Sequence, residues 1–297
     1  MTTPGQGRPA LAPEKPMTHI ASLHEFCLQF PFAVACGLIM AVTCGVFGVF
    51  VLLRRMVFIS IALSECAACG IAAASLWHIS PLWGAVVSGL VAVSFLAIDW
   101  ENARIPRDAA LGLVFAAASA GSVLLVAKSG LGLMEVKALL YGELILATSR
   151  DVIILLCLHL PLLVLCLLLL KPILYTFIDR NAAQVMGIPV RTVEFAFFLA
   201  LGLVVSAASQ TGGAILIFSY LVVVPTAALG VSRRLSVVLV LSTLLGIIAT
   251  LTGFTWSYRH DLPCNPCIII AACLFSAIIA AAAWTWQRCR RLANKAT

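Results

Sequence analysis

Long runs of apolar residues dominate this sequence, and they limit its fold more than any other feature. A helix needs about 20 apolar residues to cross the hydrocarbon core of a bilayer. Backbone polar groups in lipid must be satisfied within the segment, so such runs predict helices. Only 10% of the residues are charged, against roughly 25% in soluble domains. We therefore expect an all-α, polytopic transmembrane helical bundle of about nine spans, at residues 31–53, 57–77, 81–98, 109–127, 151–170, 193–209, 213–231, 236–256 and 268–286.

The basic residues form short clusters between the apolar runs, and this spacing predicts the orientation of the chain. The net charge is +7, but no continuous basic stripe suggests nucleic acid as a partner. Nine spans with the N-terminus outside put the main basic segments in the cytoplasm, as the positive-inside rule requires. Those segments are Arg54-Arg55, 99–108, 171–192, Arg233-Arg234 and the C-terminus. We expect a multi-pass protein of the cell (inner) membrane.

Three regions follow from composition. Residues 1–30 are rich in Pro, Thr and Gly at their start, lack the apolar core of a signal peptide, and predict a flexible N-terminal tail. Residues 31–286 form the transmembrane domain, and 287–297 form a basic cytoplasmic tail.

Segment 131–148 does not fit the nine-span scheme. It contains Glu135, Lys137 and Glu143, which make it too polar for a comfortable span. Counting it as a crossing would also break the charge assignment. We expect a re-entrant or interfacial helix on the outer side of the membrane.

The longest cytoplasmic loop, 171–192, has a short helical pattern in its middle. Residues Asp179 to Gly187 favour helix and end in a Gly-Ile-Pro stop. A short helix between two spans could dock a soluble partner. On composition alone, an ordinary solvated connector is the better interpretation.

Glu65 is the clearest ionisable residue within a span, and such a residue indicates function because its insertion is costly. Helical spacing puts Ile61, Glu65 and Cys69 in one row, with Ser64 beside it. The alternative is that Glu65 hydrogen-bonds to a neighbouring helix and that the cysteines only pack.

Two further polar features leave alternatives open. His159 lies within the fifth span, where a single histidine is more often a hydrogen-bonded packing residue than a ligand. Cys264 and Cys267 form a Cys-Asn-Pro-Cys sequence in a loop predicted outside. A disulfide is permitted there, and two unpaired cysteines are equally compatible with the sequence.

Several blocks in order resemble the zinc and manganese permease family, the membrane subunits of metal-ion ABC importers. The resemblance covers roughly residues 31–286, and each block is weak alone but specific in combination. The blocks are LRRM…ALS at 53–64, DAALGLVF at 108–115, LYGELIL at 140–146, FIDRNAAQVMGIP at 177–189, TGGAIL…PTAA at 211–228 and DLP at 261–263.

The resemblance implies a transport protein and not an enzyme, working with several partners. It implies a homodimer or pseudo-dimer with a metal path near the subunit interface, and an extracytoplasmic metal-binding protein that delivers the ion. Two cytoplasmic ATP-binding subunits would seat on the 171–192 loop as a coupling helix, through Asp179, Ala183, Gly187 and Pro189. This chain has no phosphate-binding G-x-x-x-x-G-K-[ST] motif, so ATP would bind the partner subunit, and no tightly bound cofactor is expected.

The chain departs from the family where the metal would pass. The family carries Asp and His in a GDALSHA pattern, and those positions are Ile61 and Glu65 here. Glu65 with Cys69, or with Cys66, could still hold zinc, manganese or iron, because carboxylates and thiolates ligate divalent metals. The alternatives are a permease of the same fold for a chelated metal or another small cargo and, less favoured, an intramembrane enzyme.

Overall fold

The computed structural model describes residues 25–96, 107–128 and 142–296, and within these ranges it contains helices and no strands. The all-α prediction is therefore confirmed. The elements in chain order are α2 (Pro31–Leu53), α3 (Val57–Leu76), α4 (Pro81–Leu96), α5 (Arg107–Lys128), the 3-10 turn η2 (Leu144–Leu146), α7 (Ser149–Leu168), α8 (Leu170–Ile178), α9 (Arg180–Val185), α10 (Val190–Phe218), the π-helical turn η3 (Ser219–Val223), α11 (Val224–Val231), α12 (Leu235–His260) and α13 (Cys264–Ala296).

Seven helices of the described chain are long and apolar enough to cross a membrane. Two local features explain why seven helices, and not the predicted nine, meet these criteria. The apolar helix Pro81–Phe95 is shorter than the other candidates. The predicted spans 193–209 and 213–231 belong to one helical stretch of 42 residues, Val190–Val231.

A sharp break interrupts this long stretch at Gly213. Gly213 has φ 72° and ψ 161°, a conformation that glycine adopts readily because it lacks a Cβ atom. The Asn265 side chain donates a hydrogen bond to the Gly212 carbonyl at 3.0 Å. Gly142, at φ 64°, packs so closely that an added Cβ would lie 2.4 Å from the Gly212 carbonyl carbon. The break is thus held by two distant segments of the chain.

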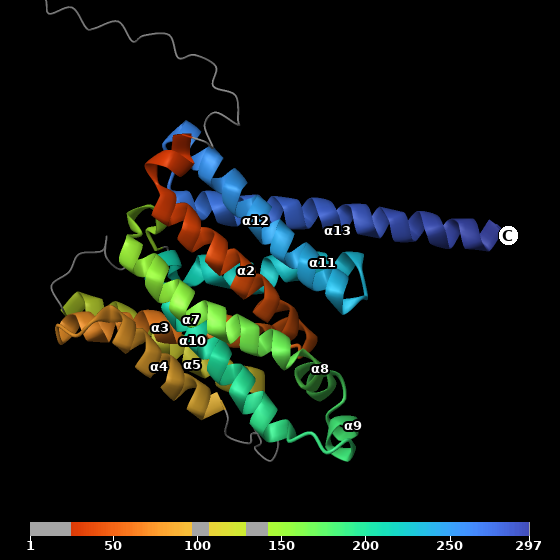
Figure 1. Cartoon of the computed structure of the whole chain (residues 1–297), viewed down its shortest axis with the longest axis horizontal. Helices are drawn as coiled ribbons and strands as arrows, with labels where there is room; N and C mark the ends of the chain where they lie inside the picture. Colours follow the sequence, from red (N-terminus) through yellow and green to blue (C-terminus); the bar gives the residue numbers. More distant parts are fainter. Residues whose placement is uncertain (1–24, 97–106, 129–141, 297) are drawn as a thin grey trace, which may run out of the picture.

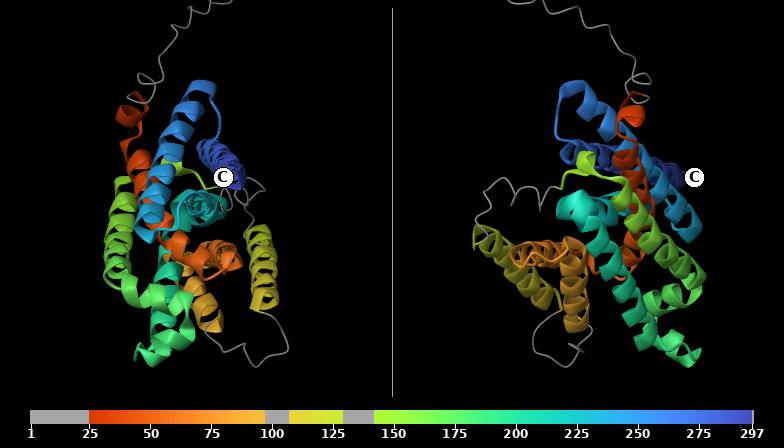
Figure 2. Two further views of the ribbon diagram at one scale, coloured as in Figure 1. Left: turned by 90° about the vertical axis from the view of Figure 1, so that its right-hand side faces the viewer. Right: turned by 60° about the vertical axis from the view of Figure 1, so that its left-hand side comes forward.

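Helix α10 joins two groups of helices. On one side it packs against α3 and α4, and α3 in turn packs against α5. On the other side it packs against α7 and α2, and α2 also packs against α12. Figures 1 and 2 show α10 between these groups, with α8 and α9 together at one end of the bundle. A shift of α10 relative to one group therefore affects both.

Small residues permit the close helix contacts, as expected for packing in lipid. Gly70 of α3 and Gly84 of α4 face each other, and a Cβ on either would lie 2.2 Å from the other's carbonyl oxygen. A Cβ on Gly48 of α2 would lie 2.3 Å from the Leu221 carbonyl oxygen. Larger side chains at these crossings would separate the helices.

The predicted terminal boundaries differ from the observed helices. Residues 1–24 of the predicted tail lie outside the described residues, but residues 25–29 are helical. Phe26 is buried there and stacks on Phe254 at 4.8 Å between ring centroids. At the other end α13 continues to Ala296, so most of the predicted basic tail extends a helix.

The predicted outer helix at 131–148 is only partly described. Residues 131–141 lie outside the described residues, while residues 142–148 contain the turn Leu144–Leu146. Leu144 is fully buried. The segment then enters α7 through a capping box between Thr148 and Asp151, which satisfies two backbone donors at the helix start.

Candidate functional site

Glu65 lies in the middle of α3 with its carboxyl group buried against α5. The residue is 6% exposed, and Ser119 of α5 interacts with the carboxyl group. Its Oε2 atom has no hydrogen-bond donor among the described residues. Because a buried carboxyl oxygen without a donor is costly, this atom is available to a proton, a water molecule or a cation.

The other predicted residues of the α3 row differ in their surroundings. Ile61 and Cys69 are half-buried, one turn before and one turn after Glu65. The Cys69 sulfur also faces α5, since it lies 3.3 Å from the position that a Cβ on Gly121 would take. Ser64 is fully buried, and its hydroxyl group donates a hydrogen bond to the Ser60 carbonyl of its own helix at 2.9 Å.

No group of three or more His, Cys, Asp and Glu side chains converges in the part of the chain that the structure describes. Glu65 and the neighbouring Cys66 and Cys69 therefore do not form a closed metal site of the kind that structural zinc requires. What α3 offers is one buried carboxylate with a half-buried thiol one turn away.

His159 is a packing residue, as the sequence predicts. It is completely buried on α7. Its Nδ1 lies 2.9 Å from the Thr43 hydroxyl of α2, and its Nε2 lies 3.2 Å from the Val204 carbonyl of α10. Both ring nitrogens are engaged, so the imidazole joins three helices.

Cys264 and Cys267 are free and buried at the start of α13. Because the helix begins at Cys264, the two cysteines lie about one turn apart. The structure thus contains the unpaired form of the two alternatives.

The segment from Asp179 to Pro189 forms a short capped helix, α9, between α8 and α10. The Asp179 carboxylate accepts hydrogen bonds from the backbone N–H groups of Asn181 and Ala182, at 3.0 Å each. Ala183 is completely buried. Gly187, at φ 77°, ends the helix in the left-handed conformation, and Pro189 caps the start of α10. The predicted short helix is confirmed.

The opposite side of α9 exposes apolar side chains. Val185 is 90% exposed and Met186 is 61% exposed, and Ile178 at the end of α8 is 68% exposed. Helices α8 and α9, which carry these residues or end beside them, lie together at one end of the bundle (Figure 1). Contiguous exposed apolar patches rimmed by polar residues mark protein or membrane interaction sites.

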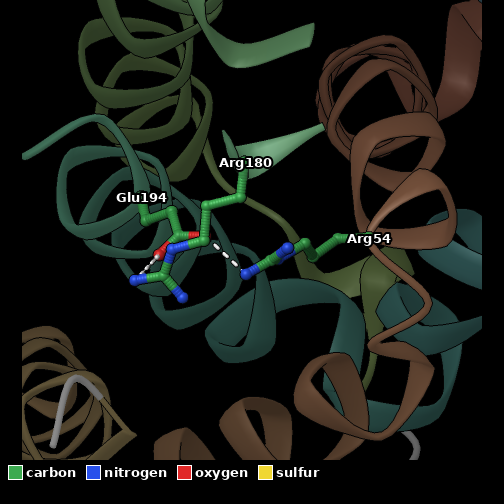
Figure 3. Close-up of polar contacts among 3 residues, drawn as sticks. All are labelled: Arg54, Arg180 and Glu194. Atoms are coloured by element: carbon green, nitrogen blue, oxygen red, sulfur yellow. Dashed lines mark hydrogen bonds and ion pairs between the residues drawn. The ribbon is translucent and has the colours of Figure 1, made fainter. Parts of the chain in front are cut away.

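Three charged side chains, one of them from α9, meet near the start of this helix. Arg54, at the C-terminal cap of α2, and Arg180, the first residue of α9, both reach Glu194 in the second turn of α10 (Figure 3). The Arg54 Nη2 atom lies 2.5 Å from one carboxyl oxygen of Glu194, and the Arg180 Nη2 atom lies 3.8 Å from the other. One carboxylate therefore links three elements.

A comparison with known protein families identifies the family of this chain. The family described as the ABC 3 transport family matches residues 28–283. The chain belongs to this family. Together with its long apolar helices, membership makes it a multi-pass cell-membrane protein with a role in transport.

Several relatives of this ABC 3 member carry names that mention metals. The manganese transport system membrane protein MntC of Halalkalibacterium halodurans is 30% identical over 86% of this chain and 89% of its own length. The chelated iron transport system membrane protein YfeD of Yersinia pestis is 26% identical over 87% of this chain and 88% of its own length. The solved structure of PsaBC from Streptococcus pneumoniae in complex with Fab matches with a TM-score of 0.78 and 25% identity, covering 88% of this chain and 95% of that chain.

Sequence reasoning missed two residues of this ABC 3 transport protein that contact the predicted ones. Ser119, which interacts with Glu65, was not singled out. Glu194 was not singled out, although an acid at the start of an apolar run beside a basic loop is a detectable signal. Neither contact could be assigned, because the partners lie 54 and 140 residues apart in the chain.

Proposed function

We propose that this chain is the membrane-spanning subunit of an ATP-driven ABC importer for divalent metal ions. Manganese is the first cargo to test, because a relative with 30% identity over most of the chain is named a manganese transport protein. Iron and zinc are the next cargoes to test. The observation that carries the proposal is α9, a capped helix that exposes Val185 and Met186 at one end of the bundle.

The proposed partner of α9 is a cytoplasmic ATP-binding subunit. Asp179 and Gly187 fix the two ends of the helix, and the buried Ala183 holds one face against the bundle. The exposed apolar side chains then form a small protrusion, which suits docking into a groove of a soluble protein. An extracytoplasmic metal-binding protein and a second copy of this chain complete the proposed complex.

We infer nine crossings with the N-terminus outside and α9 in the cytoplasm. The stretch Val190–Val231 has 42 residues and would be about 63 Å long if it were straight. The hydrocarbon core is about 30 Å thick. The break at Gly213 supports two crossings within this stretch. Basic residues near α9, including Arg54, Arg55 and Arg180, support the cytoplasmic side.

Glu65 is the proposed contact for the metal in transit. The unsatisfied Oε2 atom would gain a cation as a partner, and carboxylate oxygen suits manganese. Cys69 would contribute its sulfur more readily to zinc than to manganese. The remaining ligands would be water or groups from a second copy, since one acid alone holds a divalent ion weakly.

Transport of a chelated metal is the second candidate. The observation that favours it is Ile61, an apolar side chain one turn from Glu65, where the resembled family carries an acid. YfeD, a relative of similar coverage, is named for chelated iron transport. An apolar position beside a single carboxylate suits a larger, less charged cargo better than a bare ion.

The test is metal uptake in vesicles that contain the chain, its ATPase subunit and the metal-binding protein. Free manganese, iron and zinc are compared with chelated iron, in the wild type and in Glu65→Gln. Ser64→Ala is the matched control, because Ser64 lies beside Glu65 but donates within its own helix. ATP-dependent uptake that Glu65→Gln abolishes and Ser64→Ala retains is the expected result. Absence of uptake for every free ion, with uptake of the chelate, would favour the second candidate.

A further inference from the structure

The ion pairs that Glu194 makes with Arg54 and Arg180 connect three separate elements of the chain. Arg54 belongs to the turn between α2 and α3, Arg180 to α9 and Glu194 to α10. Each carboxyl oxygen of Glu194 faces one arginine, at 2.5 Å and 3.8 Å (Figure 3). The Glu194 carboxylate therefore pairs with both arginines at once.

The surroundings favour a persistent contact. The three side chains are only 13% to 22% exposed, so salt screens their interaction less than it screens a surface pair. The Arg54 guanidinium also lies 5.8 Å from the centroid of the Phe177 ring. Phe177 is buried and meets Phe197 of α10 edge-on, at 4.9 Å between ring centroids. Aromatic packing thus fixes Arg54 and α10 relative to α8.

The contact leads from α9 towards the candidate metal position. Helix α3 begins at Val57, three residues after Arg54. Glu65 lies eight residues further along α3, which corresponds to about 12 Å of helix. A displacement of α9 that pulls Arg180 and Glu194 would therefore reach the start of the helix that carries Glu65.

We propose that Glu194 is a positioning residue that couples movement of α9 to movement of α3. The proposal rests on the proposed function, in which a motor subunit moves α9. With glutamine at position 194, no anion would separate Arg54 from Arg180, and like charges repel. The turn after α2 would then lose its link to α9, while the exposed docking residues Val185 and Met186 would remain unchanged.

The experiment uses the full chain reconstituted with its ATPase subunit and metal-binding protein in proteoliposomes. Manganese uptake and phosphate release are measured together, so the readout is manganese transported per ATP hydrolysed. Glu194→Gln removes both contacts and Arg180→Gln removes only the contact to α9. Arg55→Gln is the matched control, because it removes the same charge from the exposed neighbour of Arg54.

We expect Glu194→Gln and Arg180→Gln to bind the ATPase subunit and hydrolyse ATP, with the transport ratio lowered about tenfold, a usual size for coupling between sites. Arg55→Gln should keep the wild-type ratio. Reversing all three charges, with Arg54→Glu, Arg180→Glu and Glu194→Arg, should raise the ratio above that of Glu194→Gln, because the attraction is re-formed with opposite signs even though Arg54→Glu loses the contact to Phe177.

Two results overturn the coupling role. An unchanged ratio in Arg180→Gln would show that the contact to α9 transmits nothing, even if Glu194→Gln fails to fold. Loss of ATPase-subunit binding in Glu194→Gln would assign the residue to docking instead. If the wild type itself shows no ATP-dependent uptake of manganese, iron or zinc, the proposed function fails, which is a different outcome from either.

Discussion

Replacing Asp179 by alanine removes both hydrogen bonds from this side chain to the start of α9. The carboxylate accepts from the N–H groups of Asn181 and Ala182, which have no partners within a helix that starts at Arg180. Loss of an N-cap of this kind costs about 1 kcal/mol. At room temperature this energy lowers the ratio of formed to unformed helix about fivefold.

A helix of six residues is marginal by itself, so a change of this size affects its population. If α9 is about half formed without a partner, the capping loss leaves it roughly one-sixth formed. A partner that binds only the formed helix would then bind about three- to fivefold more weakly. We expect this increase in the dissociation constant for the ATPase subunit.

The assay combines binding with hydrogen exchange. Backbone amides of Ala183 and Met186, which bond within α9, should fall from about twofold protection to about 1.2-fold in Asp179→Ala if the wild-type helix is half formed. Asp179→Asn is the matched control, because asparagine is also a good N-cap, and it should keep both protection and affinity. Equal protection in Asp179→Ala and the wild type would refute the capping argument. A loss in Asp179→Asn as large as in Asp179→Ala would show that charge, not capping, matters.

Two further changes test the packing described above. Gly142→Ala places a Cβ 2.4 Å from the Gly212 backbone and should lower the thermal midpoint of unfolding in detergent. Gly187→Ala is the control, because Gly187 also has a positive φ but has open space around it, and it should lower the midpoint less. Equal midpoints in the two variants would contradict the close contact. Tyr220→Phe removes the 2.6 Å hydrogen bond to Thr250 and should cost about 1 kcal/mol or less, measured against the reversible unfolding of the wild type. No loss would show that this hydrogen bond makes no net contribution to stability.

The membrane-spanning character followed from the sequence because it depends on local properties. A run such as 31–53 is apolar throughout, and the structure contains the helix Pro31–Leu53. The short helix after Asp179 was predicted from the helical propensity of its residues and its stop, and α9 has that stop. Each of these predictions needs only neighbouring residues, since helix formation and capping act over a few positions.

The details of the candidate site needed the tertiary structure. The sequence marked Glu65 as costly within a span, but the burial of its Oε2 atom depends on how α5 packs against α3. Ser64, predicted beside the path, proved to bond within its own helix. The two predicted spans on either side of Gly213 follow each other without a loop, because a single residue with positive φ can turn the helix.

Composition and the spacing of apolar runs determined that this chain is a helical membrane protein, and the ordered blocks indicated its family. Only the folded chain brought Glu194 between Arg54 and Arg180 and His159 between Thr43 and Val204. The physical reason is range. Hydrophobicity and helix capping act along the chain, whereas these charges and hydrogen bonds act across helices whose relative positions no local pattern specifies.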